Sequence, residues 1–84
     1  MPQVTIYTKD YCPYCQAAMR LLGKKNVAYE RIEVTNAEQQ AAMSARAGGR
    51  RTVPQIFIGD VHVGGSDDLH ALDAAGRLDP MLAR

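Results

Sequence analysis

The sequence contains no tryptophan, a single phenylalanine and only two cysteines among its 84 residues. A core built from this composition must be mostly aliphatic. No apolar run approaches the length of a membrane span, and no basic flank precedes an apolar stretch at the N-terminus, so we expect neither a membrane helix nor a signal peptide. Neither sign of charge is in excess, because 10 Lys and Arg are mixed with 9 Asp and Glu. This balance predicts no nucleic-acid partner and no membrane surface as a partner.

The length predicts one small domain over residues 1–84 with a limited hydrophobic core. The hydrophobic content of 46% is ordinary for a globular chain, and we find no internal repeat, linker or low-complexity segment. A single close pair of cysteines without an export signal is typical of a reducing compartment, where such pairs cycle between thiol and disulfide. We therefore expect a cytoplasmic protein.

Both cysteines lie in one short stretch, Cys12-Pro13-Tyr14-Cys15, between an apolar run and a helical pattern. This order predicts Cys12 at the N-cap of a helix, Pro13 in its first turn, and Cys15 one turn further along the same side. A thiol at a helix N-terminus faces unpaired N–H groups and the positive end of the helix dipole, and both favour the thiolate. A free thiol with a pKa of about 8.5 is only roughly 3% ionised at neutral pH, so this placement favours reactivity.

Two other interpretations of the cysteine pair compete with a redox-active one. A structural disulfide would close a loop that contains only Pro13 and Tyr14, and so short a loop stabilises a fold very little. Half of a zinc site is the second alternative, but four ligands are usual and the sequence has no second CxxC pair. The redox-active pair is the leading interpretation.

Periodicity and turn residues divide the chain into strands and helices in the order strand, helix, strand, helix, strand, strand, helix. A right-handed first crossover makes the first two strands parallel, and a tight turn at Gly59-Asp60 makes the last two antiparallel. An α/β fold follows, with a four-stranded mixed sheet flanked by helices on both faces. The expected strands cover residues 4–8, 27–34, 55–58 and 61–63, and the expected helices cover 13–24, 37–47 and about 66–75, with a final short turn opened by Asp79-Pro80.

The inward faces of the later helices are also predicted from spacing. In the second helix, three alanines at helical spacing are expected to line one face with Met43 at its border, and Gln39, Gln40 and Arg46 are expected to be solvated. In the third helix, Ser66 is the expected cap. The alanines are Ala37, Ala41 and Ala45, and the inward residues of the third helix are Leu69, Leu72 and Ala75.

Four motifs together resemble those of a known family. The sequence resembles the bacterial dithiol glutaredoxins, of the glutaredoxin 3 type, and this resemblance implies a thioredoxin-like fold. It departs from many relatives at Ser66, where they carry a further cysteine, but this position is expected to act through its backbone. The motifs follow the family order and nearly span the chain: Tyr7-Thr8-Lys9, Cys12-Pro13-Tyr14-Cys15, Thr52-Val53-Pro54-Gln55-Ile56-Phe57-Ile58 and Gly64-Gly65-Ser66-Asp67-Asp68.

The resemblance implies a site for glutathione, an anionic tripeptide with two carboxylates and one amine. A cis Pro54 would bring Val53 beside the thiols, with its backbone free to pair with the cysteine of glutathione. Thr52 would border the same edge, and Tyr14 would border the groove. Lys9 would meet the glycine carboxylate of glutathione.

The stretch Gly65, Ser66 and Asp67 would form the opposite end of that site at a helix N-terminus, which is a ready anion site. The backbone N–H groups of Ser66 and Asp67 would hold the γ-glutamyl carboxylate, and the Asp67 carboxylate would meet the ammonium group. Arg50 is a second candidate for the glycine carboxylate, unless it and Arg51 are solvated loop charges. No metal is expected, and His62 and His70 are expected on the surface without a role.

The activity implied is glutathione-dependent reduction of protein disulfides and glutathione mixed disulfides, with Cys12 as nucleophile and Cys15 as the less acidic, less exposed resolving thiol. The implied partners are glutathione, glutathionylated proteins and protein disulfides, ribonucleotide reductase among them, acted on by a monomer. Two alternatives stay open. One is a small redoxin reduced by thioredoxin reductase, and the other is an iron–sulfur carrier in which two chains share a cluster through Cys12 and glutathione.

Overall fold

The structure is a computed structural model in which residues 2–83 are described. Its four strands form one sheet in the order β2-β1-β3-β4, with β1 parallel to β2 and antiparallel to β3, and with β3 antiparallel to β4. None of the described helices is long and apolar enough to cross a membrane. The elements are β1 (Val4–Thr8), α1 (Pro13–Lys24), β2 (Tyr29–Glu33), α2 (Ala37–Arg46), β3 (Gln55–Ile58), β4 (Val61–Gly64), α3 (Ser66–Ala74) and α4 (Leu78–Leu82).

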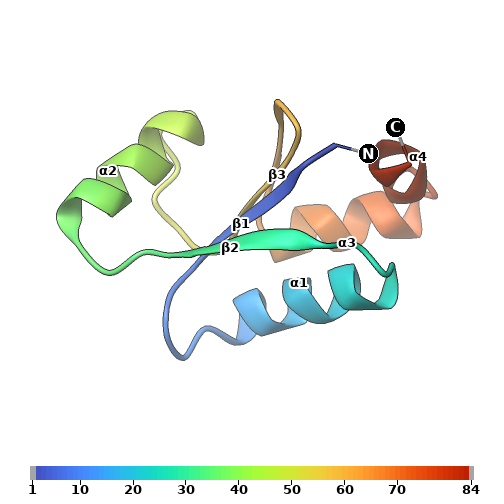
Figure 1. Ribbon diagram of the computed structural model, residues 1–84, viewed down its shortest axis with the longest axis horizontal. Helices are drawn as coiled ribbons and strands as arrows, with labels where there is room; N and C mark the ends of the chain where they lie inside the picture. The colour runs from blue at the N-terminus through green and yellow to red at the C-terminus, as the bar shows by residue number, and fades with distance from the viewer. Residues whose placement is uncertain (1, 84) are drawn as a thin grey trace.

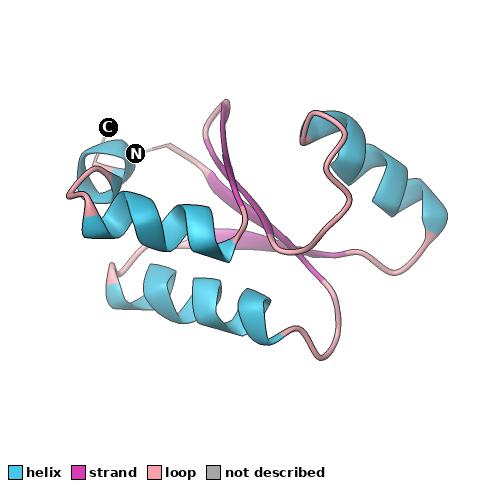
Figure 2. Cartoon of the chain, turned by 180° about the vertical axis from the view of Figure 1, so that it is seen from behind, coloured by secondary structure: helices cyan, strands magenta, loops and turns pink. Residues whose placement is uncertain are grey.

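The helices cover both faces of the sheet, so the expected α/β fold with a four-stranded mixed sheet is confirmed. Figures 1 and 2 show α1 and α3 lying together on one side of the strands and α2 alone on the other. Every residue of the central strands β1 and β3 is buried, because each strand has helices on both sides. Successive side chains point to opposite faces of a strand, so each of these two strands contributes to two cores.

The larger core lies between the sheet and α1, α3 and α4. Ile6 of β1 and Ile56 of β3 are fully buried in it against Leu22 of α1 and Leu69 of α3. The smaller core lies under α2. Its members are Tyr7, Val34, Met43, Ala47 and Phe57.

The prediction for the inner face of α2 is wrong. Ala37, Ala41 and Ala45 are exposed, whereas Met43 is fully buried and Ala47, just after the helix, is nearly so. An alanine methyl buries little apolar area, so the helix gains more by turning its one large apolar side chain toward the sheet. Gln39 and Gln40, expected to be solvated, are half-buried. Arg46 is exposed, as expected, and its guanidinium carbon lies 4.1 Å from the centre of the Phe57 ring.

The ends of the last helices also differ from expectation. Gly65, not Ser66, is the N-cap of α3, and Ala75, expected to face inward, is its exposed C-cap. The final helix begins one residue before the expected Asp79 cap and buries Leu78 and Leu82. Both leucines belong to the larger core between the sheet and α1, α3 and α4.

Strand pairing brings three loops to one end of the sheet. Because β1 and β3 are antiparallel, the C-terminal end of β1 lies beside the N-terminal end of β3, where Tyr7 pairs with Gln55. The C-terminal end of β4 is at the same end, because Gly64 pairs with Ile56. The loops before α1, before β3 and before α3 therefore meet there.

Candidate functional site

Cys12 is the N-cap residue of α1, as predicted from the Cys12-Pro13-Tyr14-Cys15 stretch, with Pro13 in the first turn. Its sulfur accepts a hydrogen bond from the Cys15 N–H at 3.2 Å. The sulfur therefore occupies the place of a capping oxygen, where the unpaired N–H groups of the first turn favour a negative charge. Both cysteines are free thiols, and Cys12 is the more accessible of the two.

Cys15 lies one turn into α1 and is only 1% exposed. Burial raises the pKa of the Cys15 thiol to about 12, and its hydrogen bond with Cys12 adds to the shift. A thiol with this pKa is protonated at neutral pH. The expected contrast between an accessible Cys12 and a buried Cys15 is present in the structure, and the raised pKa of Cys15 makes it a weaker acid than a free thiol.

A cis peptide bond joins Val53 to Pro54, as the resemblance implied. The loop that contains it approaches the N-terminus of α1, so that the Cys12 sulfur lies 3.9 Å from the Val53 carbonyl oxygen. Pro54 is buried and Val53 is half-buried. The backbone beside the reactive sulfur therefore belongs to a segment that is 41 residues away in sequence.

A groove of about 520 Å³ runs from this loop to the start of α3. It is lined by seven of the eight residues predicted to bind a ligand, together with Arg50 and Asp68. Strand pairing brings these residues together, because they come from three segments that are far apart in the sequence: the start of α1, the loop before β3 and the start of α3. The seven are Tyr14, Thr52, Val53, Pro54, Gly65, Ser66 and Asp67.

Lys9 is the predicted residue that does not line this groove. It borders a hollow of about 370 Å³ that contains both cysteines and a second hollow of about 470 Å³ that contains Gln40 and Arg51. Gln40 and Arg51 had no place in the predicted site. Arg51 could have been noticed because it directly precedes Thr52, whereas Gln40 could be placed only once the buried face of α2 was known.

Arg50 lies at the α3 end of the groove and not beside Lys9. Its guanidinium is 3.2 Å from the Asp68 carboxylate, which also accepts a hydrogen bond from the Gly65 N–H at 2.9 Å. The Gly65 N–H holds the pKa of the Asp68 carboxyl below its usual value, and Arg50 contributes to the same direction. The two cations proposed for one carboxylate are thus separated, and Asp68 is occupied by contacts within the protein.

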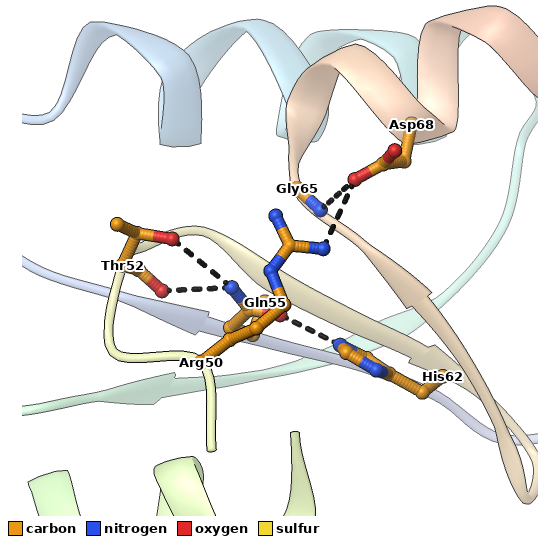
Figure 3. A network of polar contacts seen from close by, with 6 residues as sticks. All are labelled: Arg50, Thr52, Gln55, His62, Gly65 and Asp68. Atoms are coloured by element: carbon orange, nitrogen blue, oxygen red, sulfur yellow. Dashed lines mark hydrogen bonds and ion pairs between the residues drawn. The ribbon is translucent and has the colours of Figure 1, made fainter. Parts of the chain in front are cut away.

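A second polar network joins β4 to the loop before β3 (Figure 3). The His62 Nε2 lies 2.7 Å from the Gln55 Oε1, and the Gln55 Nε2 donates to the Thr52 carbonyl oxygen at 3.0 Å and to the Thr52 hydroxyl at 3.2 Å. His62 was expected on the surface, but it is half-buried and stacks on the Phe57 ring. His70 is exposed, as expected.

Within residues 2–83, no three His, Cys, Asp or Glu side chains gather in a way that could hold a metal ion. A CxxC stretch at a helix N-terminus, beside a cis proline on a mixed sheet, defines a thiol–disulfide oxidoreductase with the thioredoxin-like fold.

The chain belongs to the glutaredoxin family, whose profile matches residues 4–63. It is 51% identical over 83 residues to a glutaredoxin of Pseudomonas aeruginosa, with 99% of each chain covered. It is 52% identical over 83 residues to glutaredoxin 3 of Escherichia coli K12, covering 98% of this chain and 99% of that one.

Solved structures agree with this assignment. The buckwheat glutaredoxin–glutathione complex superposes with a TM-score of 0.87 at 34% identity, covering 98% of this chain and 77% of that one. Glutaredoxin from Brucella melitensis superposes with a TM-score of 0.85 at 49% identity, covering 98% of this chain and 89% of that one. The thioredoxin-like fold and the resemblance to glutaredoxins are confirmed.

Proposed function

We propose that this protein is a glutathione-dependent oxidoreductase that reduces glutathione mixed disulfides and protein disulfides through Cys12 and Cys15. The observation that carries the proposal is the position of the Cys12 sulfur. It caps α1 and lies 3.9 Å from the Val53 carbonyl oxygen, at the loop that lines the 520 Å³ groove. A relative of the same fold was solved as a glutathione complex.

The groove suits the chemistry of glutathione at several points. The N–H groups at the start of α3, from Ser66 and Asp67, offer a site for the γ-glutamyl carboxylate. The exposed Asp67 carboxylate would meet the ammonium group beside it. The Val53 backbone would pair with the cysteine residue of the tripeptide. Lys9 and Arg51, which line the separate hollow of about 470 Å³ and not this groove, would supply positive charge for the glycine carboxylate.

For a glutathione mixed disulfide, the Cys12 thiolate attacks the glutathione sulfur. A new disulfide forms between Cys12 and glutathione while the old one breaks, and the substrate leaves as a thiolate that takes up a proton. A second glutathione thiolate then attacks the glutathionyl sulfur, so that oxidised glutathione leaves and the Cys12 thiolate is restored. Each step exchanges one disulfide for another.

For a protein disulfide, Cys12 first forms a mixed disulfide with the substrate. Cys15 then attacks the Cys12 sulfur, its proton passes to the departing substrate thiolate, and a Cys12–Cys15 disulfide remains for two glutathiones to reduce. Glutaredoxin potentials of about −200 to −230 mV lie close to the glutathione poise of the cytosol, so glutathione can drive this cycle. We propose the cytoplasm as its location and a monomer as the acting form. Ribonucleotide reductase is one candidate substrate among protein disulfides.

Two substitutions test the proposal in an assay coupled to glutathione reductase. Cys12→Ser should abolish both activities, because it removes the nucleophile. Cys15→Ser should retain turnover of a glutathionylated peptide but lose reduction of a protein disulfide, because only the second reaction needs a resolving thiol. Loss of the first activity in Cys15→Ser would show that the roles are assigned wrongly.

The choice of reductant separates the proposal from the alternatives. We expect the Cys12–Cys15 disulfide to be reduced by glutathione with glutathione reductase and not by thioredoxin reductase alone. The opposite result would favour the thioredoxin-reductase-dependent redoxin. An anaerobically purified protein that carries the visible absorption of an iron–sulfur cluster would favour the carrier.

A further inference from the structure

We propose that Gln55 and His62 are positioning residues, which hold the Thr52–Val53–Pro54 edge of the groove through a hydrogen-bond relay with a fixed direction. Neither side chain lines the groove, so neither is expected to touch a bound ligand. The inference rests on the proposed function, because it assigns to these two residues an effect on the binding of glutathione.

The direction of the relay follows from the Thr52 carbonyl oxygen, which can only accept a hydrogen bond. The atom of Gln55 that faces it, at 3.0 Å, must therefore be the amide nitrogen. This assignment turns the Gln55 Oε1 toward His62, 2.7 Å from its Nε2. An amide oxygen cannot donate, so the His62 Nε2 must carry a hydrogen. The Thr52 carbonyl thus determines the tautomer of a histidine on the neighbouring strand β4.

Gln55 is suited to this role by its burial and by its place in the chain. It is 0% exposed, it directly follows Pro54, and its backbone is paired with Tyr7 in the centre of the sheet. Its amide holds Thr52 at two points, the carbonyl and the hydroxyl. A buried amide without hydrogen-bond partners would cost desolvation free energy. The loop arrangement that supplies these partners to Gln55 is therefore favoured.

His62 is itself held in place by stacking. Its ring lies 4.9 Å from the Phe57 ring at an interplanar angle of 24°, which fixes the direction of the Nε2–H bond. Arg50 and Asp68 act on the same ring electrostatically, with opposite signs. Protonation of His62 would add a hydrogen at Nδ1 and leave the Nε2–H in place, so the relay is compatible with both charge states.

A matched pair of variants separates positioning from packing. His62→Phe keeps an aromatic ring on Phe57 but has no donor for Gln55, whereas His62→Gln keeps a donor near the position of Nε2 but loses the ring. Positioning predicts that the KM for a glutathionylated peptide rises about threefold or more in His62→Phe with little change in kcat, and stays near the wild-type value in His62→Gln. If His62 acts only by packing on Phe57, the KM should instead rise in His62→Gln and stay near the wild-type value in His62→Phe.

The relay can also be tested in the wild-type protein, so that this test does not depend on whether a variant folds. Nitrogen-15 NMR of the His62 ring at neutral pH should show the tautomer with hydrogen on Nε2, and the Gln55 side-chain amide protons should exchange slowly with solvent. Hydrogen on Nδ1, or rapid exchange of the Gln55 amide, would overturn the relay.

The outcomes also separate this inference from the proposed function. If the wild type fails to turn over the glutathionylated peptide, both are overturned. If the wild type is active and His62→Phe has an unchanged KM, or His62→Gln is impaired as much as His62→Phe, only the positioning role is overturned. A raised KM confined to His62→Phe supports it.

Discussion

Cys12 and Cys15 have the same side chain but opposite surroundings, because they are one helical turn apart at the start of α1. Cys12 caps the helix at the surface, where its sulfur accepts the Cys15 N–H. Cys15 points into the protein and is 1% exposed. The two sulfurs thus differ in accessibility although the residues are only three positions apart. A nucleophile and a resolving thiol require this difference in accessibility.

Selective alkylation should report this difference. We expect iodoacetamide to modify Cys12 of the native reduced protein at pH 7.5 and to leave Cys15 unmodified, because burial raises the Cys15 pKa to about 12. Mass spectrometry of peptides after a timed reaction would measure the modified fraction of each cysteine. As a control, denaturation before alkylation should allow both cysteines to react. Equal modification of the two sites in the native protein would contradict the described burial of Cys15.

His62 should make the protein less stable as the solution is acidified. Burial lowers its pKa from 6.5, with Arg50 adding to the shift, so the unfolded chain binds the proton more readily than the folded protein does. Stability is therefore lost as the pH falls from about 6.5 toward the lower pKa of the folded state. The midpoint of urea unfolding should therefore fall more between pH 7 and pH 5 in the wild type than in His62→Gln. An equal fall in the two proteins would contradict the role of His62.

At the scale of elements, α2 shows how a helix chooses its buried face. Alanine spacing predicted one face, but Met43 packs against the sheet and Arg46 follows it, donating from Nη1 to the Tyr7 hydroxyl at 3.3 Å. The start of α2 agrees with the helix expected over 37–47, and the Asn36 side chain caps it by accepting the Gln39 N–H at 2.8 Å. The local signal therefore located the start of α2 but not its rotation.

The junction of β4 and α3 depends on Gly64, whose φ is 114°. A side chain there would be strained, and its Cβ would lie 2.7 Å from the Arg50 Nη1 and closer still to the Asp68 carboxylate. We expect Gly64→Ala to reduce the free energy of unfolding by about 2 kcal/mol or more. Urea unfolding followed by circular dichroism would measure it.

Gly23 provides the matched control for that substitution. It lies in the exposed part of α1, where an added Cβ would meet no heavy atom within 4 Å. Gly23→Ala should therefore stabilise the protein by roughly 0.5–1 kcal/mol, the gain in helix propensity. A stabilising Gly64→Ala would show that the tight approach at this junction is misplaced.

At the scale of the whole molecule, one lysine links three helices. Lys25, the C-cap of α1, places its Nζ 2.6 Å from the Asp73 carboxylate of α3 and 2.9 Å from the Asp79 carboxylate of α4. The hydrogen bond to Asp73 raises the pKa of Lys25 above 10.5, with Asp79 contributing. The stability that Lys25 contributes is therefore present at neutral pH and lost only as the pH rises beyond that value.

Lys25→Met should lower the thermal midpoint at neutral pH in low salt. The difference from the wild type should shrink in 1 M NaCl, because salt screens partly exposed charges. Differential scanning fluorimetry would measure both. The control is Lys24→Met, since Lys24 is exposed and forms no ion pair with any residue between 2 and 83. A salt-independent difference would show that the Lys25 stem, and not its charge, stabilises the helix junction.

The order of the elements, the place of Cys12 at the start of α1 and the family could all be predicted from the amino-acid sequence alone. These features depend on contacts within a few residues, such as caps, turns and helical spacing, which a linear pattern records. Short motifs in the family order also identified seven of the residues that line the groove.

The contacts between side chains that are distant in the sequence could not be predicted in this way and became visible in the folded structure. In that structure Lys9 lies outside the groove and borders the same hollow as Gln40 and Arg51. Arg50 pairs with Asp68, and Gln55 links His62 to Thr52. These contacts join segments brought together by strand pairing and by the rotation of α2. Such pairing depends on the packing of the whole chain, which no local stretch of sequence encodes.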